Sequence, residues 1–167
     1  MRKFLMGLTG LAMAASPMVA ASTAYAAPKK GDVKVSGQGT IEDGRTFTVN
    51  ATLYQDGTAK GQAVLINRNF SGDTGKGPYK LQIDITCAKQ LDDGTVTIGG
   101  YTRRTNDSNL VDAVFFTVED NGKDDLLSRA YFWDDDPTTM GDPAACQLVN
   151  NGDFPMEQVI RGNINVH

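Results

Sequence analysis

Histidine and cysteine are scarce in this sequence, and their scarcity excludes several kinds of catalytic and metal site. The chain of 167 residues has one histidine, His167, and two cysteines, Cys87 and Cys146. A Ser-His-Asp triad needs a histidine beside its nucleophile, and a structural zinc centre needs four Cys or His ligands. The composition therefore excludes ordinary triad catalysis, multi-histidine metal sites and a four-cysteine zinc centre.

Basic residues are also few, and they do not cluster along the chain. There are 16 Lys and Arg against 20 Asp and Glu, which gives a net charge of −4. Nucleic-acid binding requires clustered Lys and Arg to neutralise phosphates, and we expect no nucleic acid as a partner. Arg103-Arg104 is an adjacent basic pair, but it is too small for a nucleic-acid patch.

Long apolar runs are confined to the N-terminus, where residues 1–26 have the features of a secretory signal peptide. Arg2 and Lys3 precede an apolar stretch, Phe4 to Ala15, and small residues end at Ala26. We expect cleavage after Ala26 and secretion to the periplasm or the extracellular space, with no transmembrane anchor left after cleavage. Without residues 1–26, which hold two basic residues and no acidic one, the net charge becomes −6.

The rest of the chain predicts one acidic domain with one disulfide. Residues 27–31 form a flexible leader, and residues 32–167 have the length of a single β-domain. Exported proteins meet oxidising conditions, so a Cys87–Cys146 disulfide is expected. The alternative, a reactive thiol, needs a nearby base to form the thiolate, and the chain offers only His167.

Alternating apolar and polar residues predict strands throughout this domain. In Tyr79 to Cys87 every second residue is apolar, and Arg45 to Leu53 follows the same period of two. Further strands are expected at 33–36, 61–67, 95–101, 111–119, 126–133 and 159–166. Asp-Gly and Asn-Gly pairs between them favour tight hairpin turns. The fold class predicted is all-β, a single antiparallel β-sandwich or small β-barrel of about eight strands, and the sequence leaves that choice open.

Three short motifs resemble a group of small, uncharacterised secreted bacterial all-β proteins. They are Gly37-Gln38-Gly39-Thr40-Ile41 near the start of the domain, the segment Phe115 to Gly122 with its Asp-Asn-Gly, and the closing strand Gly162 to His167. That group ends on a Gly-Asn-Ile-x-Val/Ile-His strand. The resemblance implies export and a β-fold, and it assigns no functional residue.

Acidic residues in two segments are candidate metal ligands. The candidates are Asp120, Asp124, Asp125, Asp134, Asp135 and Asp136. Oxygen ligands on turns suit Ca²⁺, which exported proteins encounter. The spacing does not match an EF-hand loop, and turn geometry alone accounts for Asp and Asn at such positions. No cofactor is expected apart from this possible Ca²⁺ site.

Aromatic residues near the second acidic segment are candidate binding residues. Tyr131 and Trp133 lie on one face of the expected strand, and Ala130 and Phe132 lie on the other. If Phe132 faces the core, the first pair is presented to a sugar or a protein partner. The alternative is that Trp133, as the only tryptophan, is buried in the core.

These features favour a non-enzymatic protein of the secreted or periplasmic space, a binding or envelope-associated module. Its partner would be a glycan or an envelope protein. The alternative is a small secreted, glycan-directed hydrolase that uses paired carboxylates. The acidic residues are too numerous to nominate a catalytic pair from the sequence alone.

Overall fold

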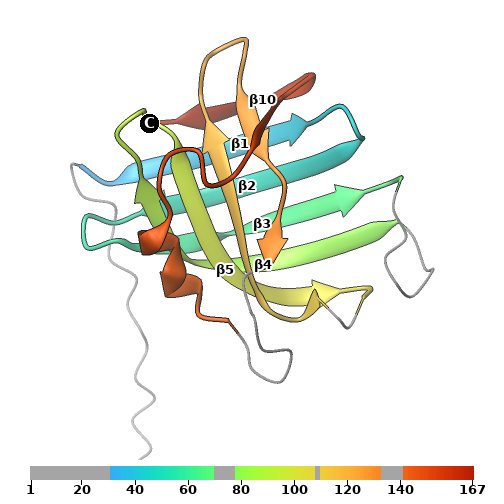
Figure 1. Ribbon diagram of the computed structural model, residues 1–167, viewed down its shortest axis with the longest axis horizontal. Coiled ribbons are helices and arrows are strands. Elements are labelled where there is room, and N and C mark those ends of the chain that lie inside the picture. The colour runs from blue at the N-terminus through green and yellow to red at the C-terminus, as the bar shows by residue number, and fades with distance from the viewer. Residues whose placement is uncertain (1–30, 70–77, 108–109, 133–140) are drawn as a thin grey trace, which may run out of the picture.

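The computed structural model describes residues 31–69, 78–107, 110–132 and 141–167, and these form an antiparallel β-structure (Figure 1). The all-β prediction is confirmed. The expected signal peptide, most of the leader, Trp133 and Asp134 to Asp136 lie outside the described residues. The elements are β1 (Val33–Thr40), β2 (Arg45–Leu53), β3 (Thr58–Asn67), β4 (Tyr79–Gln90), β5 (Val96–Thr105), β6 (Ala113–Glu119), β7 (Leu126–Ser128), β8 (Tyr131–Phe132), the 3-10 helix η2 (Pro143–Leu148), β9 (Met156–Gln158) and β10 (Arg161–Val166).

The strands make one sheet that curls into a half-barrel, so of the two predicted alternatives the structure is closer to a small barrel than to a sandwich of two sheets. The order along the sheet is β10-β1-β2-β3-β4-β5-β6-β7-β9, and β8 pairs with β6. In Figure 1, β5 and β6 run across the layer formed by β1 to β4. In the described part of the chain, no helix has the length and apolar character needed to cross a membrane.

The concave side of the sheet holds the main hydrophobic core, which follows from the alternation seen in the sequence. Phe47, Val49, Ala51 and Leu53 of β2 are buried, and the residues between them are exposed or half-buried. Phe47 meets Phe116 of β6 across the interior, with ring centroids 5.3 Å apart. Contact between these two distant strands shows that the sheet folds over its own concave face.

A register shift in β4 corrects the predicted position of Cys87. The pattern Tyr79 to Cys87 placed this cysteine on the face of Ile85, but the pairing of β4 with β5 is irregular between Ile85 and Cys87. Ile85 and Ala88 belong to the main core, while Cys87 belongs to a second apolar cluster. A β-bulge adds one residue to a strand and reverses which residues face inward beyond it.

The strand expected at 126–133 is interrupted, which corrects a second prediction. Instead of continuing along β6, the chain departs from it at Arg129 and Ala130, between β7 and β8. The backbone N–H of Thr117 in β6 donates to Ser128 Oγ at 2.8 Å, and Ser128 Oγ donates to the carbonyl of Arg129 at 2.8 Å. A side-chain hydroxyl thus takes the place of a ladder partner at this break, and β8 then pairs with β6 again in a register shifted by one residue.

The last strand expected, 159–166, begins two residues later as β10, and a short strand that was not predicted, β9, precedes it. β9 pairs with β7, whereas β10 pairs with β1. Between them, the N–H of Val159 donates to the carbonyl of Asp125, and the N–H of Ile160 donates to the carbonyl of Thr40. Residues 156–166 therefore connect the two ends of the sheet.

Candidate functional site

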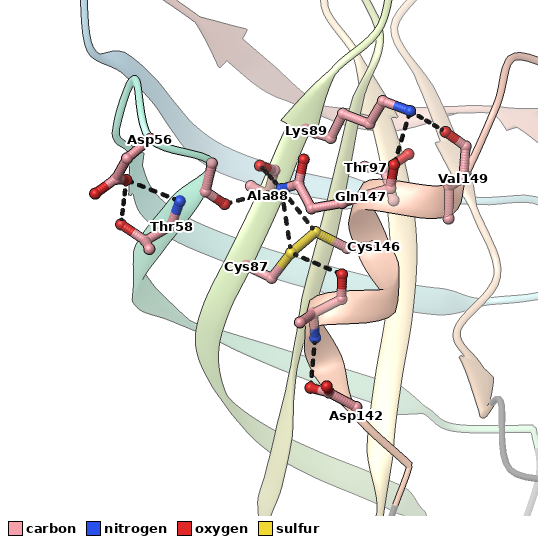
Figure 2. The surroundings of a disulfide bond; sticks show 12 residues. Asp56, Thr58, Cys87, Ala88, Lys89, Thr97, Asp142, Cys146, Gln147 and Val149 are labelled. Carbon is pink, nitrogen blue, oxygen red and sulfur yellow. Dashed lines mark hydrogen bonds between the residues drawn. A yellow bond between two sulfur atoms is a disulfide. The ribbon is translucent and has the colours of Figure 1, made fainter.

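The convex side of the sheet has two parts, and the first is covered by η2. Cys87, Ala113, Phe115 and Cys146 form a buried cluster, against which Ala145 and Phe154 pack. The Cys87–Cys146 disulfide, with Cα atoms 6.2 Å apart, joins β4 to η2 (Figure 2). The predicted disulfide is confirmed.

Polar contacts hold η2 on the sheet around this disulfide (Figure 2). Gln147 Nε2 donates to the carbonyls of Gly57 and Ala88, at 2.9 Å each. Lys89 Nζ donates to the carbonyls of Gln147 at 3.0 Å and Val149 at 2.7 Å, which places a positive charge at the C-terminal end of the helix. At its other end, Asp142 caps the N–H of Ala144 at 2.9 Å. These contacts fix η2 against the sheet on this part of the convex side.

Two of the predicted metal ligands bind the backbone of β10 instead of presenting a cluster of carboxylates. Asp125 is 2% exposed, and its carboxylate accepts from the N–H groups of Asn121 at 3.0 Å and Ile164 at 2.7 Å. Asp120 accepts from the N–H of Val166 at 3.0 Å and from that of Gly122 at 3.1 Å. Asp124 is exposed and accepts from Gln158 Nε2 at 3.3 Å.

These contacts give the acidic turn after β6 a structural role, because two of its carboxylates bind the backbone of β10. Within the described residues, no three His, Cys, Asp or Glu side chains gather as metal ligands would. Asp134 to Asp136 are outside the described part, so a Ca²⁺ site there stays a prediction.

The structure places Tyr131 beside another aromatic ring. Its ring stacks on that of Phe154, with centroids 4.5 Å apart and an interplanar angle of 7°. Ala130 and Phe132 pack against the main core, which is one of the two arrangements that the sequence left open. Tyr131 is therefore half-buried and has one ring face occupied, while its predicted partner Trp133 lies outside the described residues.

A small cavity is lined by residues from β2, β3 and β4. Its volume is about 240 Å³, and Arg45, Leu65, Asn67, Tyr79 and Ala130 line it. The Arg45 guanidinium pairs with Asp43. The positive charge of Arg45 is therefore already balanced by the carboxylate of Asp43.

Two groups near this cavity, Tyr79 and Asp43, have shifted pKa values. Burial raises the pKa of Tyr79 to about 12, and the charge of Asp107 adds to that effect. Burial alone would raise the pKa of Asp43, but the hydrogen bonds and charge of Arg45 outweigh it and lower that pKa. Both shifts keep Tyr79 neutral and Asp43 charged at neutral pH.

The second part of the convex side, on β10 and β1 to β5, carries no helix in the described structure, and we call it the open face. Its polar side chains form rows across the strands, since the register pairs Asn165 with Ser36, Ser36 with Asn50, Asn50 with Gln62, Gln62 with Asp84 and Asp84 with Tyr101. Neighbouring strands lie ~4.8 Å apart, so this row of six residues extends about 24 Å.

A hollow of about 230 Å³ lies on the open face over β3, β4 and β5. Gln62 Nε2 donates to Asp84 Oδ1 at 3.4 Å, and Arg103 Nη1 is 3.7 Å from the same oxygen. Gln82 is paired with Arg104 in the neighbouring strand. The hollow therefore presents two amides, two guanidinium groups and one carboxylate beside the exposed ring of Tyr101.

A second register shift places two arginine side chains, Arg103 and Arg104, at the hollow. Between Gln82 and Ile83 the pairing with β5 slips, so that Gln82 opposes Arg104 and Ile83 opposes Thr102. Arg103 lies in this irregularity and is exposed next to Arg104. Two consecutive residues, which an ideal strand would direct to opposite faces, thus both line the hollow.

Sequence reasoning identified neither the row nor the hollow. The polar positions of β2 and β4 were visible as the exposed half of an alternating pattern, but their neighbours depend on the register between strands. The residue types gave little signal, because the alternating polar positions of these two strands hold one amide each, Asn50 and Gln82.

Comparison of the chain with family models, with curated proteins and with solved structures found no match.

Proposed function

We propose that this protein is an exported, non-enzymatic binding module that holds a glycan chain on its open face. The observation that carries the proposal is the hollow beside Tyr101, in which the side chains of Gln62, Gln82, Asp84, Arg103 and Arg104 converge from three strands. Amide and guanidinium N–H groups can donate to sugar hydroxyls, and amide and carboxylate oxygens can accept from them. The exposed Tyr101 ring, 38% accessible, offers a face on which a pyranose ring can stack.

The size of the hollows favours an extended ligand over an enclosed one. Pockets that enclose a drug-sized ligand measure about 300–1,000 Å³. The cavity beside Arg45 and the hollow on the open face are smaller, at about 240 and 230 Å³. A chain lying along the polar row needs no enclosure, because successive units make contacts on successive strands.

Export is supported by the N-terminal sequence and by the disulfide. Residues 1–26 have a basic start, an apolar stretch and a small-residue end. The Cys87–Cys146 disulfide is the kind of bond that persists in oxidising compartments such as the periplasm. The resemblance to small secreted bacterial proteins agrees with this proposal.

A glycan array with the purified domain tests the proposal, using two variants. Gln62→Ala with Gln82→Ala and Tyr101→Ala removes the side chains that would hold the sugar, and we expect binding to fall at least tenfold. Leu148→Ala is the control, because Leu148 is 69% exposed on η2, away from the open face. A wild-type protein that binds no glycan would contradict the proposal.

The same incubation examines the alternative of a hydrolase. Bound glycans are recovered and their reducing ends are counted. An increase that depends on the protein would favour the glycan-directed hydrolase and overturn the non-enzymatic reading.

A further inference from the structure

The open face is basic although the chain is acidic. Its strands carry six basic residues directed outward, namely Lys34, Lys60, Lys80, Arg103, Arg104 and Arg161. Their positions follow from the register, which aligns Lys34 with Thr52 and Lys60, and Arg161 with Thr40. The strands of the open face contain one acidic residue, Asp84, and the other 19 acidic residues lie outside these strands in the sequence.

From this excess of basic residues on the strands of the open face we propose that its ligand is an anionic polysaccharide, a chain carrying carboxylate or sulfate groups. This inference rests on the proposed glycan-binding function and names the class of glycan. The basic residues lie along and beside the polar row, so a linear polymer can meet several of them while its hydroxyls reach the amides. An oppositely charged surface also steers a charged chain to this face and away from the acidic remainder.

The pairing of Arg103 with Asp84 leaves positive charge available for the ligand. The closest atoms of this pair are 3.7 Å apart, and the two side chains are 57% and 46% exposed. Exposed ion pairs of this kind are weak and exchange readily with other partners. A guanidinium can then bind a carboxylate or sulfate with two parallel hydrogen bonds.

The composition of the open face favours a polysaccharide over the other polyanions. Insertion into a membrane surface needs several large, exposed apolar side chains. Among the described residues, the strands of this face expose one large hydrophobic residue, Tyr101. Single-stranded nucleic acid is held by stacking of successive bases on several aromatic rings. Sugar hydroxyls, in contrast, match the amides of Gln62, Gln82 and Asn50.

Titration calorimetry with polygalacturonate, a polyuronate, tests the inference, and dextran of similar length provides the neutral comparison. We expect the wild type to bind polygalacturonate at least tenfold more tightly than dextran. Its affinity should fall as salt rises, because ions screen exposed charges. Arg103→Gln with Arg104→Gln should lower the affinity at least tenfold. Lys123→Gln, which removes one exposed basic residue in the turn after β6, is the matched control and should bind as the wild type does.

The outcomes separate this inference from the proposed function. Equal binding of the two polymers, or equal binding by the arginine variant and the wild type, would overturn the anionic assignment and leave glycan binding standing. Binding of neither polymer, together with a blank array, would overturn both. Tighter binding to anionic phospholipid vesicles or to single-stranded DNA than to polygalacturonate would also overturn the inference.

Discussion

The two parts of the convex side differ in what lies on them, although both belong to one sheet. On β6, residues Ala113 to Val118 are all buried, because one face meets the core and the other meets η2 and its surroundings. On β2, buried residues alternate with exposed or half-buried ones, because the core covers one face alone. The covered part has apolar residues and a disulfide, while the open face has amides and basic residues.

Under the proposed function, stability and ligand binding depend on separate surfaces of the sheet. Apolar residues on the convex side are concentrated where η2 can exclude water from them, and burial there stabilises the fold. Polar side chains of the open face remain hydrated, so their replacement should change stability little. Mutations can therefore test whether the two parts are independent.

The largest effect should come from the covered part, by replacement of both cysteines. The double variant Cys87→Ala, Cys146→Ala releases a closed loop of 59 residues and should lose about 4 kcal/mol of unfolding free energy in the chain-entropy model. Urea denaturation of the double variant and the wild type measures this loss of unfolding free energy. Glycan binding at a temperature where the variant is folded should be unchanged, and a loss of binding would show that the two parts are coupled.

The next largest effect should come from Asp125, whose carboxylate joins the turn after β6 to β10. Asp125→Ala leaves the N–H groups of Asn121 and Ile164 without their carboxylate, and each hydrogen bond to a charged group contributes ~1.5–3 kcal/mol, so we expect a loss of about 3 kcal/mol. Asp124→Ala is the control and should change stability by less than about 0.5 kcal/mol, since Asp124 is exposed. Similar losses for both variants would contradict the structural role of Asp125.

A smaller effect is expected from Gly99, which allows η2 to approach the sheet. A Cβ atom at this position would lie 2.7 Å from the carbonyl oxygen of Pro143 and 3.1 Å from Cys146 Cβ. Overpacking of this kind costs about 1–3 kcal/mol, and thermal unfolding of Gly99→Ala measures it. In the background without the disulfide the helix can move away, so the cost should be smaller there. An equal cost in both backgrounds would show that η2 does not cause it.

The smallest change in stability should come from the open face. Gln62→Ala and Gln82→Ala should each alter the unfolding free energy by no more than about 0.5 kcal/mol, because surface substitutions remove few native contacts. Urea denaturation of these variants against wild type is the measurement. A loss above 1 kcal/mol would mean that the amides stabilise the sheet, and that their absence would weaken ligand binding indirectly.

Strand positions could be predicted because alternation is a local property of the sequence. Arg45–Leu53 was predicted with the bounds that β2 has, and the Cys87–Cys146 pairing followed from the presence of two cysteines. The reversal at Cys87 could not be predicted, because a bulge changes the register without altering the residue types. The break at Arg129 depends on a contact between Ser128 and Thr117, eleven positions apart.

The open face illustrates what sequence reasoning left out. Arg103-Arg104 was visible as a pair, but strand geometry places adjacent residues on opposite faces, and only the bulge brings both to one hollow. Asp120 and Asp125 were selected as metal ligands for their type and spacing. Their actual partners, Val166 and Ile164, lie about 40 residues further along the chain and were out of reach of local patterns.

The position of residues 156–166 between β7 and β1 also has a consequence for the order of folding. β1 pairs with β10 through Val35 and Val166, so the pairing must bring together segments from opposite ends of the domain. Hairpins between β1 and β5 can form as the chain emerges, but the curled sheet stays open along both outer strands until residues 156–166 are present. Contacts of such long sequence separation slow folding, so we expect closure at β10 to be the late step of a slow reaction.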